Sequence, residues 1–206
     1  FLRSDFYMRL RDLESALQDV RSFDTALQKM ELEQYPTSPH LAARMVYTAA
    51  TNFDDIDGKN VVDLGTGTGI LALGCVLMGA DSVLGIDADA DALEIARENI
   101  EELIGSEGPL DLLLCDVATL RTRETVTAAT IVGDCEVDAV GCRAAPERRV
   151  DTVIMNPPFG TRNKGIDVLF LEKAIAMRPK AIYSLHKSST RNFLLEKARR
   201  DWNVES

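Results

Sequence analysis

From residue 60 onward, segments that predict β-strands alternate with segments that predict helices. The predicted strands cover Asn60–Leu64, Ser82–Ile86, Leu110–Cys115, Val150–Met155 and Ala181–Leu185, and the predicted helices cover Ile70–Met78, Ala90–Leu103 and Asp167–Met177. Such alternation is typical of an α/β fold with a doubly wound, mainly parallel sheet. Ligands of these sheets bind beyond the carboxyl ends of the strands. A functional site is therefore expected where the strands end.

The first 50 residues predict helices that precede the sheet. Apolar residues recur at steps of three and four over Leu2–Met30, which predicts an amphipathic helix with a break near Ser22–Asp24. Thr37-Ser38-Pro39 is typical of a helix start, because proline fits the first turn, and it leads into a helix over Leu41–Ala50. At 206 residues the chain is expected to form a single domain.

Composition narrows the classes of function. The longest nearly apolar run, Ile70–Ala80, has 11 residues, well short of the ~20 that a membrane-spanning helix needs, so no membrane role is expected. The net charge of −10 argues against a general polyanion binder, yet residues 160–200 hold ten basic and three acidic side chains. This excess indicates either a solvated helical face or a surface for an anionic ligand. Residues 121–149 lack periodicity and are interpreted as a surface insertion.

The cysteines and histidines give no metal-site pattern. The four cysteines show no C-x-x-C spacing, and His40 and His186 are the only histidines of the chain. We therefore expect no metal, and we interpret the cysteines as reduced thiols of an intracellular protein. The sequence also shows no obvious Ser-His-Asp or paired-carboxylate arrangement.

A glycine-rich loop, Asp63–Gly69, joins the first predicted strand of the alternating region to the next helix. Gly65 and Gly67 allow the backbone to approach a ligand closely, which a Cβ atom would prevent. Asp87 ends the following strand, where a carboxylate can accept bonds from both hydroxyls of a ribose. Asp116 ends the third strand and is placed to meet an adenine edge. The combination predicts a nucleoside site; a tight turn with two helix-capping aspartates is the alternative.

The sequence Asn156-Pro157-Pro158-Phe159 follows the fourth predicted strand. The two prolines end strand pairing and restrict the backbone, which makes the segment rigid. The Asn156 side-chain carbonyl and the Pro157 backbone carbonyl are two acceptors that suit a planar exocyclic amine. Phe159 offers a face on which a base can stack, which is worth about 1–3 kcal/mol. The motif therefore predicts a site that orients an amine for group transfer.

The glycine loop together with Asn-Pro-Pro-Phe resembles the class I, S-adenosylmethionine-dependent amino-methyltransferases, which have a Rossmann-like fold. Within them the chain is similar to the methyltransferase-like protein five family, whose members methylate adenine N6 of small-subunit ribosomal RNA. The resemblance runs from about residue 9 to about residue 202 and rests on five stretches: Leu32–Thr37, Asp63–Gly69, Asp87 with Asp91–Ile95, Val153–Thr161 and Tyr183–Thr190.

The resemblance implies roles for particular residues. The residues implied to contact S-adenosylmethionine are Gln34, Thr37, Gly65, Gly67, Thr68, Ile70, Asp87, Asp116 and Val117. Asn156, Pro157, Pro158 and Phe159 would hold the target adenine. Beside these, Tyr35 is a candidate lid over the cofactor or an extruded base, and Lys187 a candidate contact to substrate phosphate. The alternatives for these two are a turn before a helix and a polar strand end.

The resemblance also implies partners and a location. The family works as a heterodimer with a small zinc-binding activator subunit that covers an exposed sheet edge, and its rRNA substrate implies a nuclear, nucleolar or cytoplasmic location. The fold of the family ends with an antiparallel hairpin of two further strands, which the sequence lacks up to Ser206. The 121–149 insertion is longer than the family usually carries.

The acceptor has alternatives. Asn-Pro-Pro-aromatic motifs also serve methylation of guanine N2 in RNA, adenine in DNA and glutamine in proteins, and the residue pattern alone does not separate these. A non-catalytic RNA-binding scaffold is the remaining hypothesis. Intact Asp87, Asp116 and Asn156 argue against it. The leading hypothesis is methylation of an adenine of ribosomal RNA that is unpaired or flipped into the site.

Overall fold

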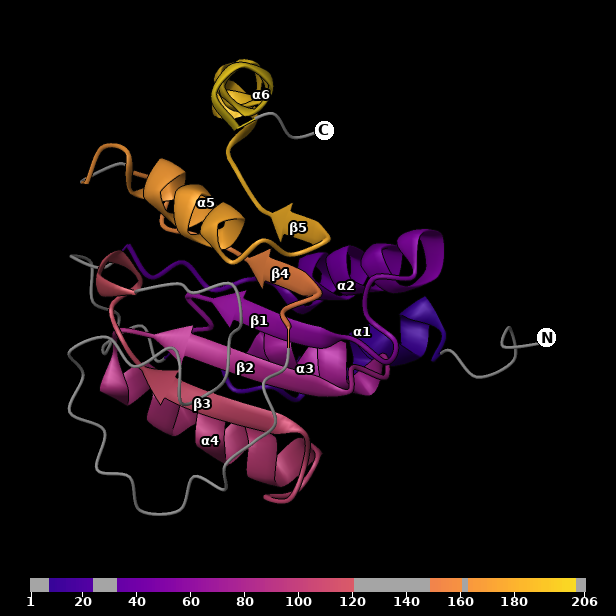
Figure 1. Ribbon diagram of the computed structural model, residues 1–206. Helices are drawn as coiled ribbons and strands as arrows, with labels where there is room; N and C mark the ends of the chain where they lie inside the picture. The colour runs from indigo at the N-terminus through magenta and orange to yellow at the C-terminus, as the bar shows by residue number, and fades with distance from the viewer. Residues whose placement is uncertain (1–7, 24–32, 121–148, 161–162, 203–206) are drawn as a thin grey trace.

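A computed structural model describes residues 8–23, 33–120, 149–160 and 163–202. Its centre is a five-stranded, fully parallel sheet with the strand order β3-β2-β1-β4-β5 (Figure 1). The strands are β1 (Asn60–Leu64), β2 (Ser82–Asp87), β3 (Leu110–Leu114), β4 (Thr152–Met155) and β5 (Ala181–Ser184). The prediction of a doubly wound parallel sheet is confirmed, and each strand lies within one or two residues of its predicted bounds. The strand order reverses between β1 and β4, where ligands of such sheets bind.

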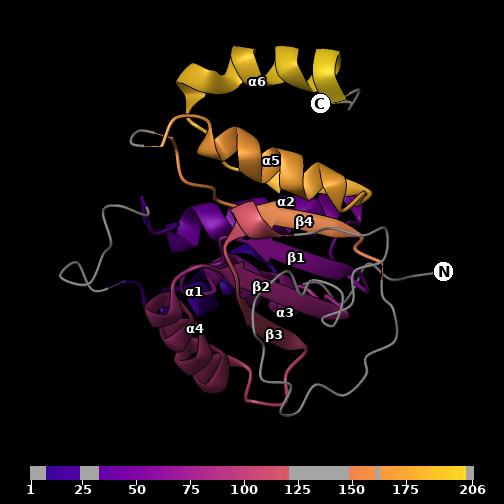
Figure 2. The same ribbon diagram turned by 60° about the vertical axis from the view of Figure 1, so that its left-hand side comes forward.

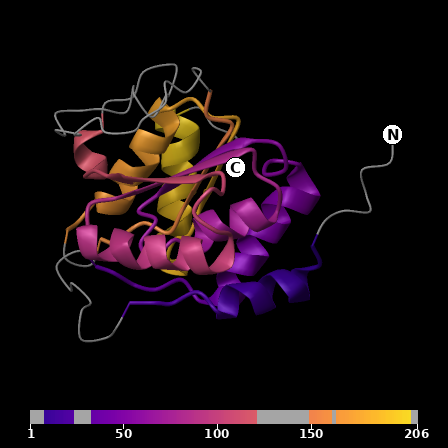
Figure 3. The same cartoon turned by 90° about the horizontal axis from the view of Figure 1, so that it is seen from below.

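Helices cover both faces of the sheet (Figure 3). The face with α1, α2 and α3 buries the larger apolar cluster, which Ile100 of α4 joins, and the opposite face packs against α5. The helices are α1 (Leu10–Gln18), α2 (Pro39–Phe53), α3 (Ile70–Leu77), α4 (Ala90–Leu103), α5 (Ile166–Ala176) and α6 (Arg191–Lys197). In Figure 2 α6 lies beyond α5, on the side away from the sheet. All four residues of β4 are buried, as expected for a strand covered on both faces.

Local sequence explains where α2 begins and ends. The Ser38 hydroxyl accepts a hydrogen bond from the Leu41 amide, and Pro39 occupies the first helical turn, so the predicted helix start is confirmed. The helix runs three residues beyond its predicted end at Ala50. It stops at Asp54, whose left-handed backbone, with φ of 57°, caps it.

The first helix ends earlier than the break predicted near Ser22–Asp24. Helix α1 ends at Gln18, although Val20 and Phe23 continue its apolar spacing. The reason is tertiary: the Asn99 amide accepts a hydrogen bond from the Arg21 backbone N–H at 2.8 Å and donates one to the Arg21 carbonyl at 3.0 Å. These bonds occupy the backbone groups that a continuing helix would use. The remainder of the predicted helix and nearly all of the 121–149 insertion lie outside the described residues.

Two of the four cysteines lie in the described part of the chain. Cys75 in α3 and Cys115 after β3 are buried free thiols, as interpreted from the sequence. Burial raises the pKa of the Cys75 thiol, which keeps it protonated. No helix in the described ranges combines the length and the hydrophobicity that crossing a membrane requires.

Candidate active site

A pocket of about 260 Å³ opens at the carboxyl ends of β1, β2 and β4, where the strand order reverses. It brings together residues that are up to 147 positions apart, from Phe23 to Phe170. All the residues predicted to contact the cofactor line it: Gln34, Thr37, Gly65, Gly67, Thr68, Ile70, Asp87, Asp116 and Val117. Their placement matches the prediction, and their role as ligands stays a prediction.

The glycine loop between β1 and α3 forms the floor of this pocket. Gly65 and Gly67 have φ angles of 72° and 57°, which glycine adopts without strain. Side chains at these positions would also meet neighbours: a Cβ atom on Gly65 would lie 3.0 Å from the Phe170 ring, and one on Gly67 would lie 3.3 Å from the Phe23 ring. Both rings line the pocket, yet the sequence reasoning did not select them because they occur in apolar helical patterns.

Asp87 fastens this loop to the end of β2. Its carboxylate accepts hydrogen bonds from the Gly67 N–H at 2.8 Å and from the Asp89 N–H at 2.9 Å. Burial raises its pKa above the usual aspartate range. Each carboxylate oxygen has a second lone pair, so Asp87 can hold the loop and still accept bonds from a ligand in the pocket.

The alternative interpretation of Asp87 and Asp116 as helix caps is correct for one of them. Asp116 accepts a hydrogen bond from the Ala118 N–H at 2.8 Å and caps the short 3-10 helix Val117–Thr119. The cap of α4 is Asp89 rather than Asp87. Because Asp116 also lines the pocket, its capping bond fixes the carboxylate at the pocket wall.

Asp63, the acidic residue at the buried end of β1, was not selected by the sequence reasoning. It is fully buried, and its Oδ2 atom accepts hydrogen bonds from the Thr66 hydroxyl at 2.7 Å and the Ala72 N–H at 3.1 Å. Burial raises the pKa of its carboxyl group to about 7. Asp63 therefore holds both the glycine loop and the first turns of α3. An acidic residue inside an otherwise apolar strand, directly before a glycine loop, is the signal that identifies it.

The Asn-Pro-Pro-Phe segment follows β4 at the opposite wall of the pocket. Asn156 and Pro158 line the pocket, whereas Pro157, which is buried, and Phe159 do not. The Phe159 ring stacks on the exposed ring of Tyr35, with 5.5 Å between ring centroids and 25° between the planes. The Lys187 ammonium group lies 5.3 Å from the centroid of Phe159. Both predicted substrate contacts, Tyr35 and Lys187, thus lie against the ring that is predicted to carry the base.

The Asn156 amide is held from one side only. Its Nδ2 atom donates to the Thr37 hydroxyl at 2.9 Å and weakly to the Tyr35 carbonyl at 3.5 Å. Its Oδ1 atom is buried and has no hydrogen-bond partner among the described residues. A buried acceptor without a partner is costly, by about 1–3 kcal/mol, and is therefore uncommon. Its position at the wall of a pocket indicates that a donor belonging to a ligand satisfies it.

The sequence shows no obvious Ser-His-Asp arrangement, but the fold places three such side chains near one another. The Ser184 hydroxyl lies 2.7 Å from His186 Nε2, and Asp167 Oδ2 lies 3.8 Å from His186 Nδ1. Sequence spacing did not reveal the group because Asp167 comes from the first turn of α5. Burial lowers the pKa of His186 below its ordinary value, and the nearby Asp167 opposes this shift. His186 does not line the pocket; it joins the end of β5 to α5.

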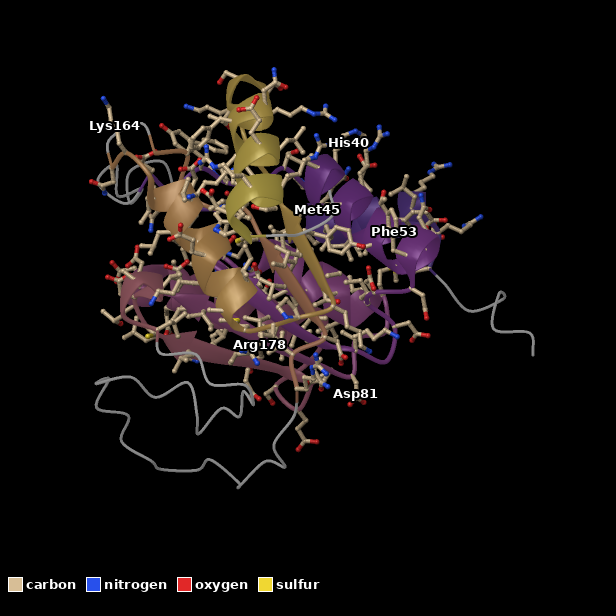
Figure 4. All side chains as sticks on the ribbon, turned by 45° about the horizontal axis from the view of Figure 1, so that its top comes forward. His40, Met45, Phe53, Asp81, Lys164 and Arg178 are labelled. Carbon is tan, nitrogen blue, oxygen red and sulfur yellow. The ribbon has the colours of Figure 1, made fainter. Side chains whose placement is uncertain are left out.

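The basic segment 160–200 is partly ion-paired in the structure, and its role as a surface for an anionic ligand stays a prediction. Ion pairs hold Lys180 to Asp151, Lys197 to Glu172, and Arg200 to Asp201, as expected of a solvated face. Five cations have no ion pair in the described part of the chain: Lys164, Lys173, whose ammonium donates to the Leu120 carbonyl, Lys187, Arg191 and Arg199. Figure 4 shows the Lys164 side chain extending outward near the start of α5. Arg162 lies outside the described residues.

Comparisons with known proteins point to one chemistry. The family model for ribosomal protein L11 methyltransferase (PrmA) matches residues 37–128. The rRNA N(6)-adenosine-methyltransferase METTL5 of Danio rerio is 45% identical over 96% of this chain and 83% of its own length. The Mettl5 protein of Drosophila melanogaster is 40% identical over 93% and 78%. The crystal structure of PH1948 from Pyrococcus horikoshii has a TM-score of 0.71 at 31% identity and covers 94% of this chain and 81% of that one.

Proposed function

The chain belongs to the METTL5 family of rRNA N6-adenosine methyltransferases, and we propose that its Asn156 pocket is the catalytic site. The activity is S-adenosylmethionine-dependent methylation of adenine N6 in ribosomal RNA. The observation that carries the proposed site is the buried, unpartnered Asn156 Oδ1 atom at the pocket wall. It is the acceptor that an exocyclic N–H group requires.

The residues of the pocket fit the cofactor. The positive-φ glycines leave a cradle that side chains would fill, and Asp87 and Asp116 supply acceptors at the far wall from Asn156. Asp87 would accept hydrogen bonds from the ribose hydroxyls of the cofactor, and the apolar residues Ile70 and Val117 would contact the cofactor's adenine ring. When bound, S-adenosylmethionine supplies a methyl group on a positively charged sulfur. The pocket is continuous from the aspartates to Asn156, so donor and acceptor can meet.

The acceptor wall is built to orient an amine. The nitrogen of adenine N6 is a poor nucleophile because its lone pair is delocalised into the ring. A hydrogen bond from an N–H group to the Asn156 side chain would align it and favour a more pyramidal nitrogen, whereas the Pro157 carbonyl, predicted as the second acceptor, does not line the pocket. Phe159 would stack on the base, and the Pro157-Pro158 backbone keeps these groups in place. Catalysis then comes from positioning and preorganised dipoles rather than from a charged base.

Replacing Asp87 by alanine is expected to weaken cofactor binding about tenfold to a hundredfold, because the ribose would lose a hydrogen-bond acceptor and the loop would lose the Gly67 bond. Isothermal titration calorimetry with S-adenosylmethionine measures the effect. Glu101→Ala, which removes an exposed carboxylate from α4, serves as the matched control and keeps the wild-type affinity. Equal affinities of the Asp87 variant and the control would contradict the role given to Asp87.

The identity of the methyl acceptor is tested by offering the protein RNA, DNA and protein substrates in parallel reactions. The protein, with its proposed partner subunit, is incubated with labelled S-adenosylmethionine and separately with small-subunit rRNA, DNA and protein. Digestion to nucleosides or amino acids then identifies the labelled product. We expect label in N6-methyladenosine from rRNA. Label in guanosine, in deoxyadenosine alone or in glutamine would overturn the assignment of Asn156 to an RNA adenine.

Two cations without an ion pair among the described residues, Lys187 and Arg191, lie near the site and support binding of the RNA backbone there. Lys187 lies over Phe159, and Arg191 follows in the next turn of the chain, at the start of α6. With most of the protein acidic, these groups provide a local attraction for phosphate. We propose that they guide the RNA backbone while the target base enters the pocket, and that Tyr35 covers the base there. The product is modified rRNA, so a nuclear or cytoplasmic location is proposed with it.

A heterodimer with the small zinc-binding activator subunit is proposed as the working form. The supporting observation is the edge strand β3, which pairs only with β2 among the described residues and leaves the Leu114 side chain half exposed. An unpaired edge with apolar side chains is a site for pairing with another chain. The Cys115 N–H bonds to β2, so the alternate backbone groups, at Leu112 and Leu114, point away from β2.

Placing a charge on this edge tests the heterodimer. Leu114→Lys is expected to abolish co-purification with a co-expressed activator subunit, because a lysine blunts pairing at a strand edge. Leu41→Lys, which changes a similarly exposed leucine on α2, is expected to leave the complex intact. Co-purification of the Leu114 variant at the wild-type level would contradict docking on β3.

A further inference from the structure

We propose that Thr37 is a positioning residue that sets the orientation of the Asn156 amide, so that its oxygen rather than its nitrogen faces the acceptor base. The proposal rests on the proposed function of the Asn156 site. It gives Thr37 a role in the methyl-transfer step that is separate from its predicted contact with the cofactor. The starting observation is the 2.9 Å hydrogen bond from Asn156 Nδ2 to the Thr37 hydroxyl, which links residues 119 positions apart.

An asparagine side chain can turn either end toward a ligand. The two ends differ chemically, because the NH₂ group only donates hydrogen bonds and the oxygen only accepts them. The amine of adenine is a donor in both of its in-plane N–H directions, so only the oxygen end can hold it. If the NH₂ end faced the base, two donors would oppose each other. The site therefore needs a device that selects one of two orientations of nearly the same shape.

Residues 35 and 37 together make this selection. The Tyr35 carbonyl can only accept, so the amide end that faces it must be the NH₂ group. At 3.5 Å that contact is weak, and the shorter bond to the Thr37 hydroxyl holds the group in place. With Nδ2 held on this side, Oδ1 lies on the other side, where it is buried and has no partner among the described residues.

Thr37 is itself held in place by its neighbours. Ser38 caps α2, and Pro39 restricts the backbone directly after it. On the other side, the Gln34 amide donates to Asp89 at 2.6 Å, and the buried Glu33 carboxylate accepts from the Asn163 N–H at 3.2 Å. The segment from residue 33 to residue 38 is thus attached at both ends. The Thr37 hydroxyl is therefore held in a fixed position next to the Asn156 amide.

Removing the hydroxyl tests the inference. Thr37→Val keeps the shape of the side chain but loses the shorter of the two bonds, so only the weak contact with the Tyr35 carbonyl still favours one orientation and the other orientation becomes populated. We expect kcat at saturating cofactor to fall about tenfold, which corresponds to the loss of one hydrogen bond of ordinary strength. Thr37→Ser retains a hydroxyl and is expected to recover most of the activity. The cofactor dissociation constant of the valine variant is expected to stay within about threefold of the wild-type value.

A control variant tests whether the effect is specific to the Thr37 hydroxyl. The Thr51 hydroxyl donates to the Tyr47 carbonyl and to the Asn52 side chain, both of which belong to α2. Thr51→Val is therefore expected to keep the wild-type kcat. A Thr37→Val kcat within twofold of wild type would overturn the inference. So would a loss that excess cofactor restores, because Thr37 would then act through cofactor binding. Thr37→Ala repeats the test if the valine variant unfolds. Failure of the wild-type protein to methylate adenine would instead overturn the proposed site.

Discussion

Asn156→Ala is expected to reduce methyl transfer to adenine by at least about a hundredfold and to leave cofactor affinity within about threefold. Asn156 supplies the acceptor oxygen that would align the amine, and the alanine variant has nothing in its place. The cofactor end of the pocket keeps its aspartates and glycine loop, so S-adenosylmethionine should still bind. Single-turnover transfer to rRNA and calorimetry with the cofactor measure the two quantities separately.

The separation of the two effects is the decisive part of this test. Asn52→Ala, at an exposed position on α2, controls for loss of an asparagine side chain and should change neither quantity. Methyl transfer by the Asn156 variant at the wild-type rate would show that the amine is oriented elsewhere. Parallel loss of transfer and cofactor binding would place Asn156 in the cofactor site instead.

Asp63 is expected to make the stability of the cofactor-free protein depend strongly on pH. Its carboxyl pKa is about 7 in the folded protein because of burial, against 3.8 for an unperturbed group. Between these values the folded protein binds a proton that the unfolded chain has released, so the free energy of unfolding falls as pH rises. The stability present below pH 4 is lost through about pH 7. A shift of this size corresponds to a few kcal/mol.

Asp63→Asn removes the ionisation and should remove this dependence. The asparagine oxygen can still accept from Thr66 and Ala72, so the fold should persist. Urea unfolding between pH 4 and pH 8.5 is expected to show the variant gaining stability relative to wild type as pH rises. The raised pKa of Asp87 is present in both proteins, so the difference between the curves reports mainly on Asp63. Asp111→Asn, at an exposed site on β3, should parallel wild type, and a parallel Asp63 curve would contradict the prediction.

Local patterns predicted the sheet well because each strand carries its own apolar run and ends at a polar or glycine residue. They placed the end of the first helix too late, because the apolar spacing continues beyond Gln18 whereas Asn99 of α4 binds the backbone of Arg21. The spacing of apolar residues at steps of three and four carries no information about a hydrogen-bond partner 78 positions away. The same holds for Phe23 and Phe170, whose rings lie against the glycine loop although their own segments look like ordinary core helices.

The sequence by itself determined the chemistry that is available. The glycine loop, Asp87, Asp116 and Asn-Pro-Pro-Phe are local, because backbone freedom, hydrogen-bonding type and rigidity belong to the residues themselves. Only the tertiary structure decided how that chemistry is oriented. The Asn156 amide has two ends of nearly equal shape, and the end that faces the pocket depends on Thr37 and Tyr35, which another part of the chain supplies. The pKa of Asp63 likewise depends on burial, which exists only once helices cover both faces of the sheet.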